Sequence, residues 1–168
     1  MTGLPPRTVA ESRTSVVRLM VPTDANFTGN VFGGQILAEL DRVAFVVAGR
    51  HSHQNCVTAS IDRMDFLAPV HVGDLVEWLA ELTYVGRTSM EIWIQVSAEP
   101  LQGGSRRRVG EAFMTMVALD GAGHPTEVPP LDLLSEAERR RFAEGQSRAA
   151  MRRRSRPAHE SNTQGQPR

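Results

Sequence analysis

A glycine pair and a carboxylate stand about two helical turns apart in one stretch of the chain, where they could act on a carbonyl compound. Gly33-Gly34 opens the stretch, and Asp41 follows it. The first turn of a helix leaves backbone N–H groups without intrahelical partners, and glycine lacks the side chain that would keep a ligand away from them. A polarised carbonyl oxygen could bind there, with Asp41 on the order of 10 Å further along unless a neighbouring copy brings another carboxylate closer.

The same residues also fit a purely structural interpretation, in which the glycines only begin a helix and Asp41 is a capped core residue. A Gly-Gly turn is a weak motif, so these residues alone favour neither interpretation. By helical periodicity Asp41 falls on the border of an apolar stripe, and we expect it not to be fully solvated. Burial of a carboxylate costs several kcal/mol unless partners compensate.

One long helix and a set of strands must position these residues. From Gly34 onward apolar residues recur with the spacing of one helical face, at Ile36, Leu37, Leu40, Val43, Ala44, Val47 and Ala48. Alternation of apolar and polar residues predicts strands over 15–21, 57–63, 75–85, 90–96 and 109–119. A strand, one long helix and then several antiparallel strands predict an α+β fold with a curved sheet around the helix.

Composition limits the partners and the compartment. The chain has 168 residues, and its 19 basic and 19 acidic residues balance, which gives no reason to expect nucleic acid or an acidic membrane as a partner. Cys56 is the only cysteine, and we place His51 and His53 in a solvated loop, so no metal site is expected. With neither a signal peptide nor a membrane-spanning apolar run, we expect a soluble cytoplasmic protein.

The character of the chain changes after its sheet-forming part. We expect a sheet domain over 14–130, a short polar helix over 131–150 and a disordered Arg-rich tail over 151–168. Ser135 is the expected N-cap of that helix, with Glu138 as its capping-box partner. The run Arg152-Arg153-Arg154 could contact phosphate or acidic lipid, although short arginine runs are also common in solvated tails.

Four segments carry a further signal. They are Pro22-Thr-Asp24-Ala-Asn26-Phe-Thr-Gly29-Asn-Val-Phe32-Gly33-Gly34, then Leu40-Asp41, then Asp65-Phe66-Leu-Ala-Pro69-Val-His-Val-Gly73-Asp74, and finally Tyr84-Val-Gly86-Arg87-Thr-Ser89-Met90. Each is weak alone, but four in this order are specific. Together they resemble the hotdog-fold acyl-CoA thioesterases, and the bacterial and brain-type acyl-CoA hydrolases in particular. The similarity covers about residues 15–130.

The resemblance implies an acyl-CoA hydrolase of fatty acid metabolism whose hotdog units pair edge to edge. It places the active site at the interface of this homodimer and implies further assembly into hexamers. By motif, Asn26 and Asp41 match the catalytic residues, and Gly34 matches the glycine whose N–H polarises the thioester carbonyl. No cofactor and no metal are implied, because CoA is part of the substrate.

The resemblance also assigns substrate contacts. They are Gly33, Thr58, Ser60, Gly86, Arg87, Thr88 and Ser89, of which the last four form a turn matched to CoA binding. Arg87 could pair with a CoA phosphate or be a solvated turn residue. Phe45, Phe66 and Met90 could line an acyl tunnel, or could belong to the core, which is the commoner place for such side chains.

The chemistry fits these assignments. A thioester is already activated toward attack, so an enzyme needs an oxyanion site and either a nucleophile or a base for water. Asp41 could deprotonate water or attack the carbonyl to form a mixed anhydride, and the sequence does not choose between these routes. The amide of Asn26 could position the water or the carboxylate, since it offers both a donor and an acceptor.

Three alternatives have different consequences. A non-catalytic acyl-CoA sensor with this fold would bind the thioester without cutting it, and it has no need of a base such as Asp41. A hotdog dehydratase would normally carry a His on or near the long helix, and none precedes His51. A mere assembly scaffold would have Asp41 in a salt bridge with an arginine, away from any pocket.

Overall fold

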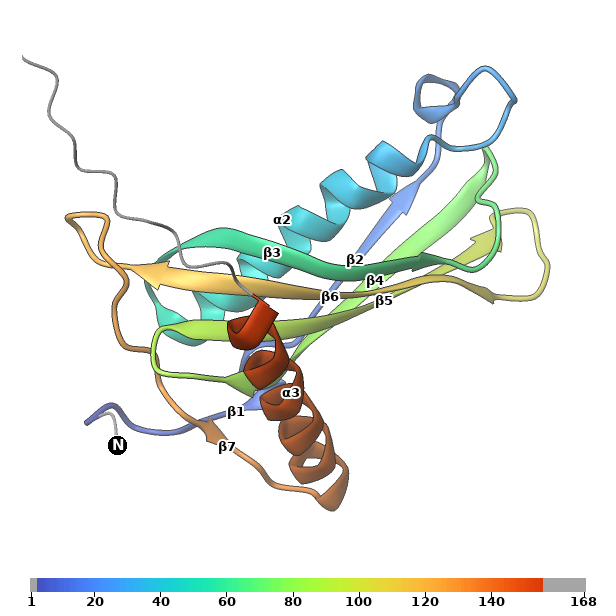
Figure 1. Ribbon diagram of the computed structural model, residues 1–168. Helices are drawn as coiled ribbons and strands as arrows, with labels where there is room; N and C mark the ends of the chain where they lie inside the picture. The colour runs from blue at the N-terminus through green and yellow to red at the C-terminus, as the bar shows by residue number, and fades with distance from the viewer. Residues whose placement is uncertain (1–2, 156–168) are drawn as a thin grey trace, which may run out of the picture.

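A five-stranded antiparallel sheet curves around one long helix in the computed structural model, which describes residues 3–155 (Figure 1). The helix is α2, Gly33–Ser52. The strands of the sheet are β2 (Thr14–Leu19), β3 (Asn55–Phe66), β4 (Asp74–Val85), β5 (Ser89–Pro100) and β6 (Arg107–Leu119). Their order across the sheet is β2-β4-β5-β6-β3. The predicted α+β class and the wrapped helix are confirmed.

Helix α2 forms where the apolar stripe predicts it and buries that stripe against the sheet. Ile36, Leu40 and Val47 are buried, and each such aliphatic side chain contributes about 1.5–3 kcal/mol by leaving water. The helix ends at His53, which adopts the left-handed conformation at φ 54° and donates its N–H to the carbonyl of Gly49. Facing residues of β4 and β5 complete the core, among them Trp78, Leu82, Met90, Ile92 and Ile94.

Strand β3 differs from its prediction in length and regularity. It runs over Asn55–Phe66 where the sequence predicts only 57–63, and its pairing with β6 shifts register between Thr58 and Ser60 and again between Ile61 and Arg63. Such bulges bend a strand and redirect its side chains. Because β3 pairs with β6 alone, its other edge carries backbone groups without a strand partner within the described part of the chain.

The N-terminal arm, residues 3–13, contains two short elements. Arg7–Thr8 forms the short strand β1, which pairs in parallel with β7, Leu131–Asp132, and the single-turn helix α1 follows at Val9–Ser12. The Arg7 guanidinium donates to the carbonyl of His51 at 2.7 Å, so the arm is tied to the end of α2.

The C-terminal helix α3, Glu136–Ser155, lies on the face of the sheet opposite α2 (Figure 1). Its predicted capping box is confirmed, because the Ser135 hydroxyl accepts from the N–H of Glu138 at 3.2 Å and the Glu138 carboxylate accepts from the N–H of Ser135 at 3.1 Å. The bounds 131–150 are wrong at both ends, since β7 occupies the start and the helix continues past 150.

The expectation of disorder is therefore wrong for residues 151–155, which belong to α3. The physical reason is electrostatic: Arg152 pairs with Asp62 and with Glu91, each at 2.7–2.8 Å, although the segment has little apolar surface to bury. The rest of the predicted tail, 156–168, lies outside the described residues. No helix within residues 3–155 is both long and apolar enough to cross a membrane.

Candidate active site

The start of α2 presents bare backbone. The N–H groups of Gly33 and Gly34 have no hydrogen-bond acceptor within residues 3–155, as expected for a first helical turn. A Cβ on Gly34 would overlap the ring of Phe32, and a Cβ on Gly33 would lie 3.3 Å from Cζ of Phe66. Both glycines are therefore needed for two aromatic rings to approach this turn.

An apolar groove of about 430 Å³ opens beside the same turn. Its walls are Asn30, Val31, Gly33, Ile36 and the segment from Phe66 to Val70. Phe66 and Leu67 are more than half exposed there. Phe66 thus faces a groove next to the glycines. Of the other two side chains considered for an acyl tunnel, Met90 is fully buried in the core, and Phe45 is 47% exposed and does not line this groove.

Asn26 lies in the loop before α2, and its side chain is fixed by that loop. The Asn26 Oδ1 accepts from the N–H of Thr28 at 2.9 Å, from the Thr28 hydroxyl at 2.7 Å and from the N–H of Asn30 at 3.3 Å. The amide nitrogen has no acceptor within the described residues. Of the two functions expected of this amide, only that of donor remains available to a ligand.

Asp41 lies on the exposed surface of α2 rather than in the partly buried position predicted for it. Its carboxylate accepts from the Thr58 hydroxyl of β3 at 2.5 Å. The prediction of partial burial is wrong for a single chain, because within residues 3–155 the elements around α2 leave this side chain exposed. Within residues 3–155 Asp41 forms no ion pair, which contradicts the scaffold alternative.

The expected catalytic residues are not joined within one chain. No hydrogen bond connects Asn26, Gly34 and Asp41 in the described residues, and Asp41 contacts only Thr58 among the residues singled out in the sequence. A reacting carbonyl held at Gly34 would thus be about two helical turns from Asp41 of the same chain.

A second, larger groove of about 860 Å³ brings together most of the residues expected to contact CoA. Ser60 of β3 and the turn Arg87-Thr88-Ser89 line it. Gly86 shapes that turn, because its N–H donates to the carbonyl of Ser89 at 2.8 Å. The Arg87 side chain is 75% exposed, and its ion pair with Glu127 is long, at 4.0 Å. Its guanidinium is therefore available to a ligand.

The sequence reading missed the contribution of α3 to this groove. Arg152 and Arg153 of α3 form part of its wall, opposite the turn. Beneath them, the buried Glu91 of β5 accepts from Arg148 at 2.8 Å and from Arg152 at 2.8 Å. The spacing of Arg148 and Arg152, four residues apart on one helical face, was the available signal.

Glu91 remains charged in this buried position. Burial by itself raises the pKa of the Glu91 carboxyl, but hydrogen bonds from Arg148, Arg152 and Thr83 outweigh it and lower that pKa below its ordinary value of 4.5. An unpaired buried carboxylate would cost several kcal/mol, so the two arginines are what permits this position.

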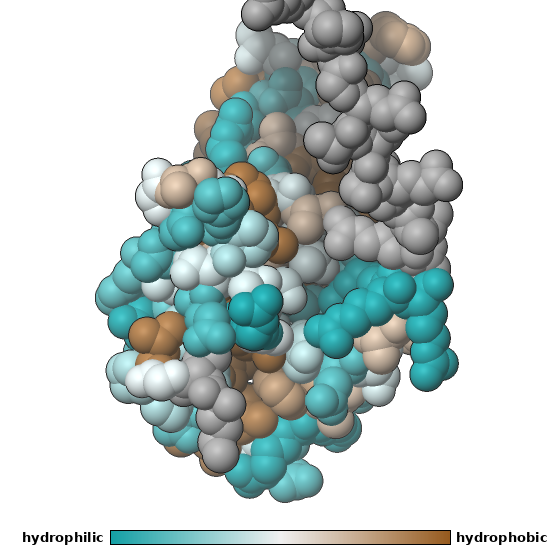
Figure 2. Space-filling model, turned by 60° about the vertical axis from the view of Figure 1, so that its left-hand side comes forward, coloured by the Kyte–Doolittle hydropathy of each residue, from teal (hydrophilic) through white to brown (hydrophobic). Residues whose placement is uncertain are grey.

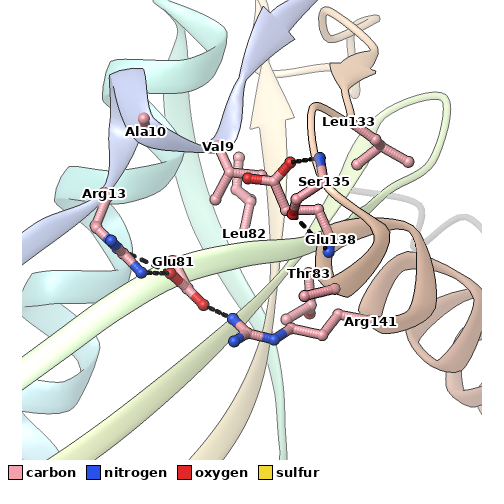
Figure 3. A pocket seen from close by; sticks show the side chains of 11 residues that line it. Val9, Ala10, Arg13, Glu81, Leu82, Thr83, Leu133, Ser135, Glu138 and Arg141 are labelled. Atoms are coloured by element: carbon pink, nitrogen blue, oxygen red, sulfur yellow. Dashed lines mark hydrogen bonds and ion pairs between the residues drawn. The ribbon is translucent and has the colours of Figure 1, made fainter.

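A third, smaller cavity of about 170 Å³ lies between α1, β4 and α3 (Figure 3). Its charged side chains bind one another: the buried carboxylate of Glu81 accepts from Arg13 at 2.5 Å and also from Arg141 (Figure 3). The Glu138 carboxylate in its wall caps α3. The side chains around this cavity therefore connect the N-terminal arm and the C-terminal helix through Glu81.

Of the two histidines expected in a solvated loop, His51 lies elsewhere. His51 belongs to α2, is buried, and its Nε2 lies 2.8 Å from the carbonyl oxygen of Pro129. Burial lowers the pKa of His51, so the neutral ring donates this bond. In the described part of the chain no three His, Cys, Asp or Glu side chains gather as metal ligands.

Comparison with known proteins places this geometry in context. Residues 28–104 match the family model described as the thioesterase superfamily. The chain is 36% identical over 156 residues to the cytosolic acyl coenzyme A thioester hydrolase of Rattus norvegicus, covering 92% of this chain but only 41% of that protein. It is 38% identical over 119 residues to the acyl-CoA thioester hydrolase YkhA of Bacillus subtilis, covering 71% and 69% of the two chains.

Solved structures agree over almost the whole described chain. A hexameric acyl-CoA thioesterase superposes with a TM-score of 0.85 at 38% identity, covering 90% of this chain and 97% of that one. An acyl-CoA hydrolase from Staphylococcus aureus, solved with butyryl coenzyme A and coenzyme A, superposes with a TM-score of 0.82 at 30% identity, covering 89% and 92%. The chain spans about two fifths of the length of the rat relative.

Proposed function

The chain belongs to the hotdog-fold acyl-CoA thioesterases, and from this membership we propose that it hydrolyses an acyl-CoA thioester to a free carboxylic acid and CoA. The observation that carries the proposal is the Asp41 carboxylate, which is exposed, paired with no cation in the described residues and held by the Thr58 hydroxyl. A carboxylate kept in this way is available as a base or a nucleophile.

In the proposed reaction the Gly34 N–H binds the thioester oxygen. Its position at the positive end of α2 favours the negative charge that develops on that oxygen when the carbonyl is attacked. The amide N–H of Asn26, whose Oδ1 is occupied by its own loop, donates to the attacking water or to the carbonyl. Neither group has to reorganise during the reaction, because the loop bonds and the helix fix both.

Asp41 completes the reaction by one of two balanced routes. As a base it takes a proton from water while the water oxygen adds to the carbonyl carbon; the carbon–sulfur bond then breaks, and the thiolate of CoA receives the proton. As a nucleophile it forms a mixed anhydride with departure of the CoA thiolate, and water then cleaves the anhydride. The Thr58 hydroxyl orients the carboxylate in either route.

We place the complete site between two copies of the chain. The open edge of β3 and the adjacent surface of α2 expose apolar side chains, including Ile61 at 45% and Phe45 at 47%. Pairing along β3 would cover this surface and the unpaired strand edge. It would also let Gly34 of one copy serve with Asp41 of the other, which one chain alone leaves apart. We further propose that the dimers assemble into a hexamer, because the chain is similar to a hexameric acyl-CoA thioesterase.

In this proposal residues 14–130 carry the chemistry and the residues of the larger groove bind CoA. Ser60, Arg87, Thr88 and Ser89 line that groove, and Gly33 borders the apolar groove that would receive the acyl chain. Gly86 shapes the turn, and Thr58, whose hydroxyl binds Asp41, is a proposed substrate contact outside the groove wall. The reaction requires no group besides water and the substrate. A cytoplasmic location is proposed from the name of the rat relative.

Release of free thiol from a panel of acyl-CoAs, from acetyl to palmitoyl, tests the proposal. We expect turnover by the wild type, and a loss of about a hundredfold or more in Asp41→Asn, which keeps the side-chain shape, and in Asn26→Ala. The matched control is Glu39→Gln, which neutralises another α2 carboxylate, one that pairs with Arg18 and Arg42. It should retain most activity.

Two results would contradict the proposal. A wild type that binds acyl-CoA without releasing thiol would favour the sensor alternative. An Asp41→Asn variant as active as the wild type, with unchanged circular dichroism, would remove Asp41 from the reaction.

A further inference from the structure

The larger groove lies between the hotdog sheet and the C-terminal helix. One wall is the hotdog sheet, with Ser60, Thr88, Ser89 and Thr115 providing hydroxyl groups. The other wall is α3, which lies beyond the 14–130 unit and contributes Ala149, Arg152 and Arg153. A ligand in this groove therefore touches the C-terminal helix as well as the sheet.

The charged side chains of the groove indicate which kind of ligand it binds. Arg87, Arg152 and Arg153 line it, and Asp62 is the only acidic side chain among its lining residues. Asp62 is already bound to Arg152 at 2.7 Å, so its charge is compensated. The hydroxyls of Ser60 and Thr115 also donate to Asp62, which leaves those of Thr88 and Ser89 for a ligand. Positive charge in excess beside these hydroxyls suits a phosphate ester.

Arg152 and Arg153 have different positions in this wall. Arg152 bridges Asp62 and the buried Glu91 and thereby fixes the last turns of α3 over the groove. Arg153 is exposed and forms no ion pair within residues 3–155, while its side chain lines the groove. The bridge thus holds the helix in place, and the next residue adds a second arginine to the wall of the groove.

We propose that α3 completes the CoA-binding groove and that Arg153 binds a phosphate group of the nucleotide end of CoA. The inference rests on the proposed function and adds to it a substrate-binding residue from outside the hotdog unit. Strand β3 links the groove to the chemistry, because Ser60 lines the groove and Thr58, two residues away, holds Asp41. Arg153 would thus act on substrate binding and not on the chemical step.

The test is Arg153→Ala in the full chain, with kcat and KM measured on a short acyl-CoA and on the matching acyl-pantetheine, which lacks every phosphate. We expect KM for the acyl-CoA to rise about fivefold or more with kcat nearly unchanged, as loss of one charge-assisted contact predicts. For acyl-pantetheine the ratio of variant to wild type should stay near one. The same comparison with acyl-dephospho-CoA shows which phosphate Arg153 binds.

The matched control is Arg154→Ala. Arg154 is the next residue of α3, is exposed and does not line the groove. Its replacement removes the same charge as Arg153→Ala and should leave KM unaltered. An equal rise in KM for both variants, or no rise for Arg153→Ala, would overturn the proposal. Calorimetric titration with free CoA gives the same comparison without turnover, so that an inactive wild type would refute the hydrolase function alone.

Discussion

At the scale of single residues, the start of α2 is the most constrained part of the candidate site. The Phe32 ring lies where a Cβ of Gly34 would be, and the Phe66 ring would be 3.3 Å from a Cβ of Gly33. Glycine is favoured here by close approach to these rings and not by backbone conformation, since neither residue has a positive φ.

Replacement of this glycine gives the prediction at residue scale. Gly34→Ala should lower kcat about tenfold or more, because the new Cβ stands between the N–H groups and the thioester oxygen. Stability should change little, since the Phe32 ring that the Cβ displaces is 57% exposed and can turn away. Thiol release and thermal unfolding measure the two effects.

The double variant Phe32→Ala with Gly34→Ala separates the two possible causes. It removes the ring that the new methyl group would push. If the double variant regains wild-type kcat, displacement of Phe32 and not obstruction of the N–H groups explains the loss, and the assignment of Gly34 to the oxyanion site is wrong.

At the scale of elements, charge pairs and a glycine dock α3 onto the sheet. Glu91 receives Arg148 and Arg152, and the Arg148 guanidinium also lies 4.2 Å from the centre of the Phe113 ring. Gly145 allows the close approach: a Cβ there would lie 2.6 Å from Cβ of Tyr84 and 2.7 Å from Oε1 of Glu91. The polar sequence of α3 is therefore compatible with tight docking.

Gly145→Ala is the corresponding prediction. Because the neighbouring Cβ of Tyr84 cannot move without its strand, the added methyl group should push α3 from the sheet and lower the free energy of unfolding by about 1–3 kcal/mol, as overpacking does. Chemical denaturation followed by circular dichroism measures it.

Gly49→Ala in α2 is the matched substitution, since a Cβ at Gly49 has no atom within 4 Å. It should be neutral or stabilise the fold by up to about 1 kcal/mol, because alanine favours helix. A Gly145→Ala variant as stable as Gly49→Ala would show that α3 does not pack closely on the sheet in solution.

At the scale of the whole molecule, exposed apolar side chains and an open strand edge are where we propose that a second copy binds. Apolar side chains reach the surface in patches between hydrophilic ones (Figure 2). Within residues 3–155 the edge strands of the sheet are β2 and β3, and Thr58 of β3 binds Asp41. A site completed between copies would therefore use the β3 edge.

Ile61→Asp tests this arrangement. A charge on the 45% exposed Ile61 should prevent pairing along β3, give a smaller species in light scattering after size exclusion, and reduce kcat at least tenfold because each site loses its partner. The matched change on the other edge is Val17→Asp, at a side chain 54% exposed. It should keep the dimer and its activity. Loss of the dimer with Val17→Asp but not with Ile61→Asp would place the interface at β2.

The fold class, the order of the main elements and the residues able to do chemistry could be predicted from the sequence. Periodicity is a local property, so the stripe from Ile36 to Ala48 and the alternation of β4 and β5 could be read directly. The capping box at Ser135 is likewise local. Family resemblance added the roles expected of Asn26, Gly34 and Asp41, which remain to be tested.

Contacts between residues far apart in the sequence could be seen only once the chain was folded. The docking of α3 depends on Glu91 and Arg152, which are 61 residues apart, and no local pattern reports such an ion pair. The exposure of Asp41 depends on which elements of one chain cover α2, and the burial of His51 depends on Pro129. Long-range contacts fix burial and charge pairing. For that reason the tail boundary, the environment of Asp41 and the docking of the α3 arginines on Glu91 beside the groove could not be derived from the sequence.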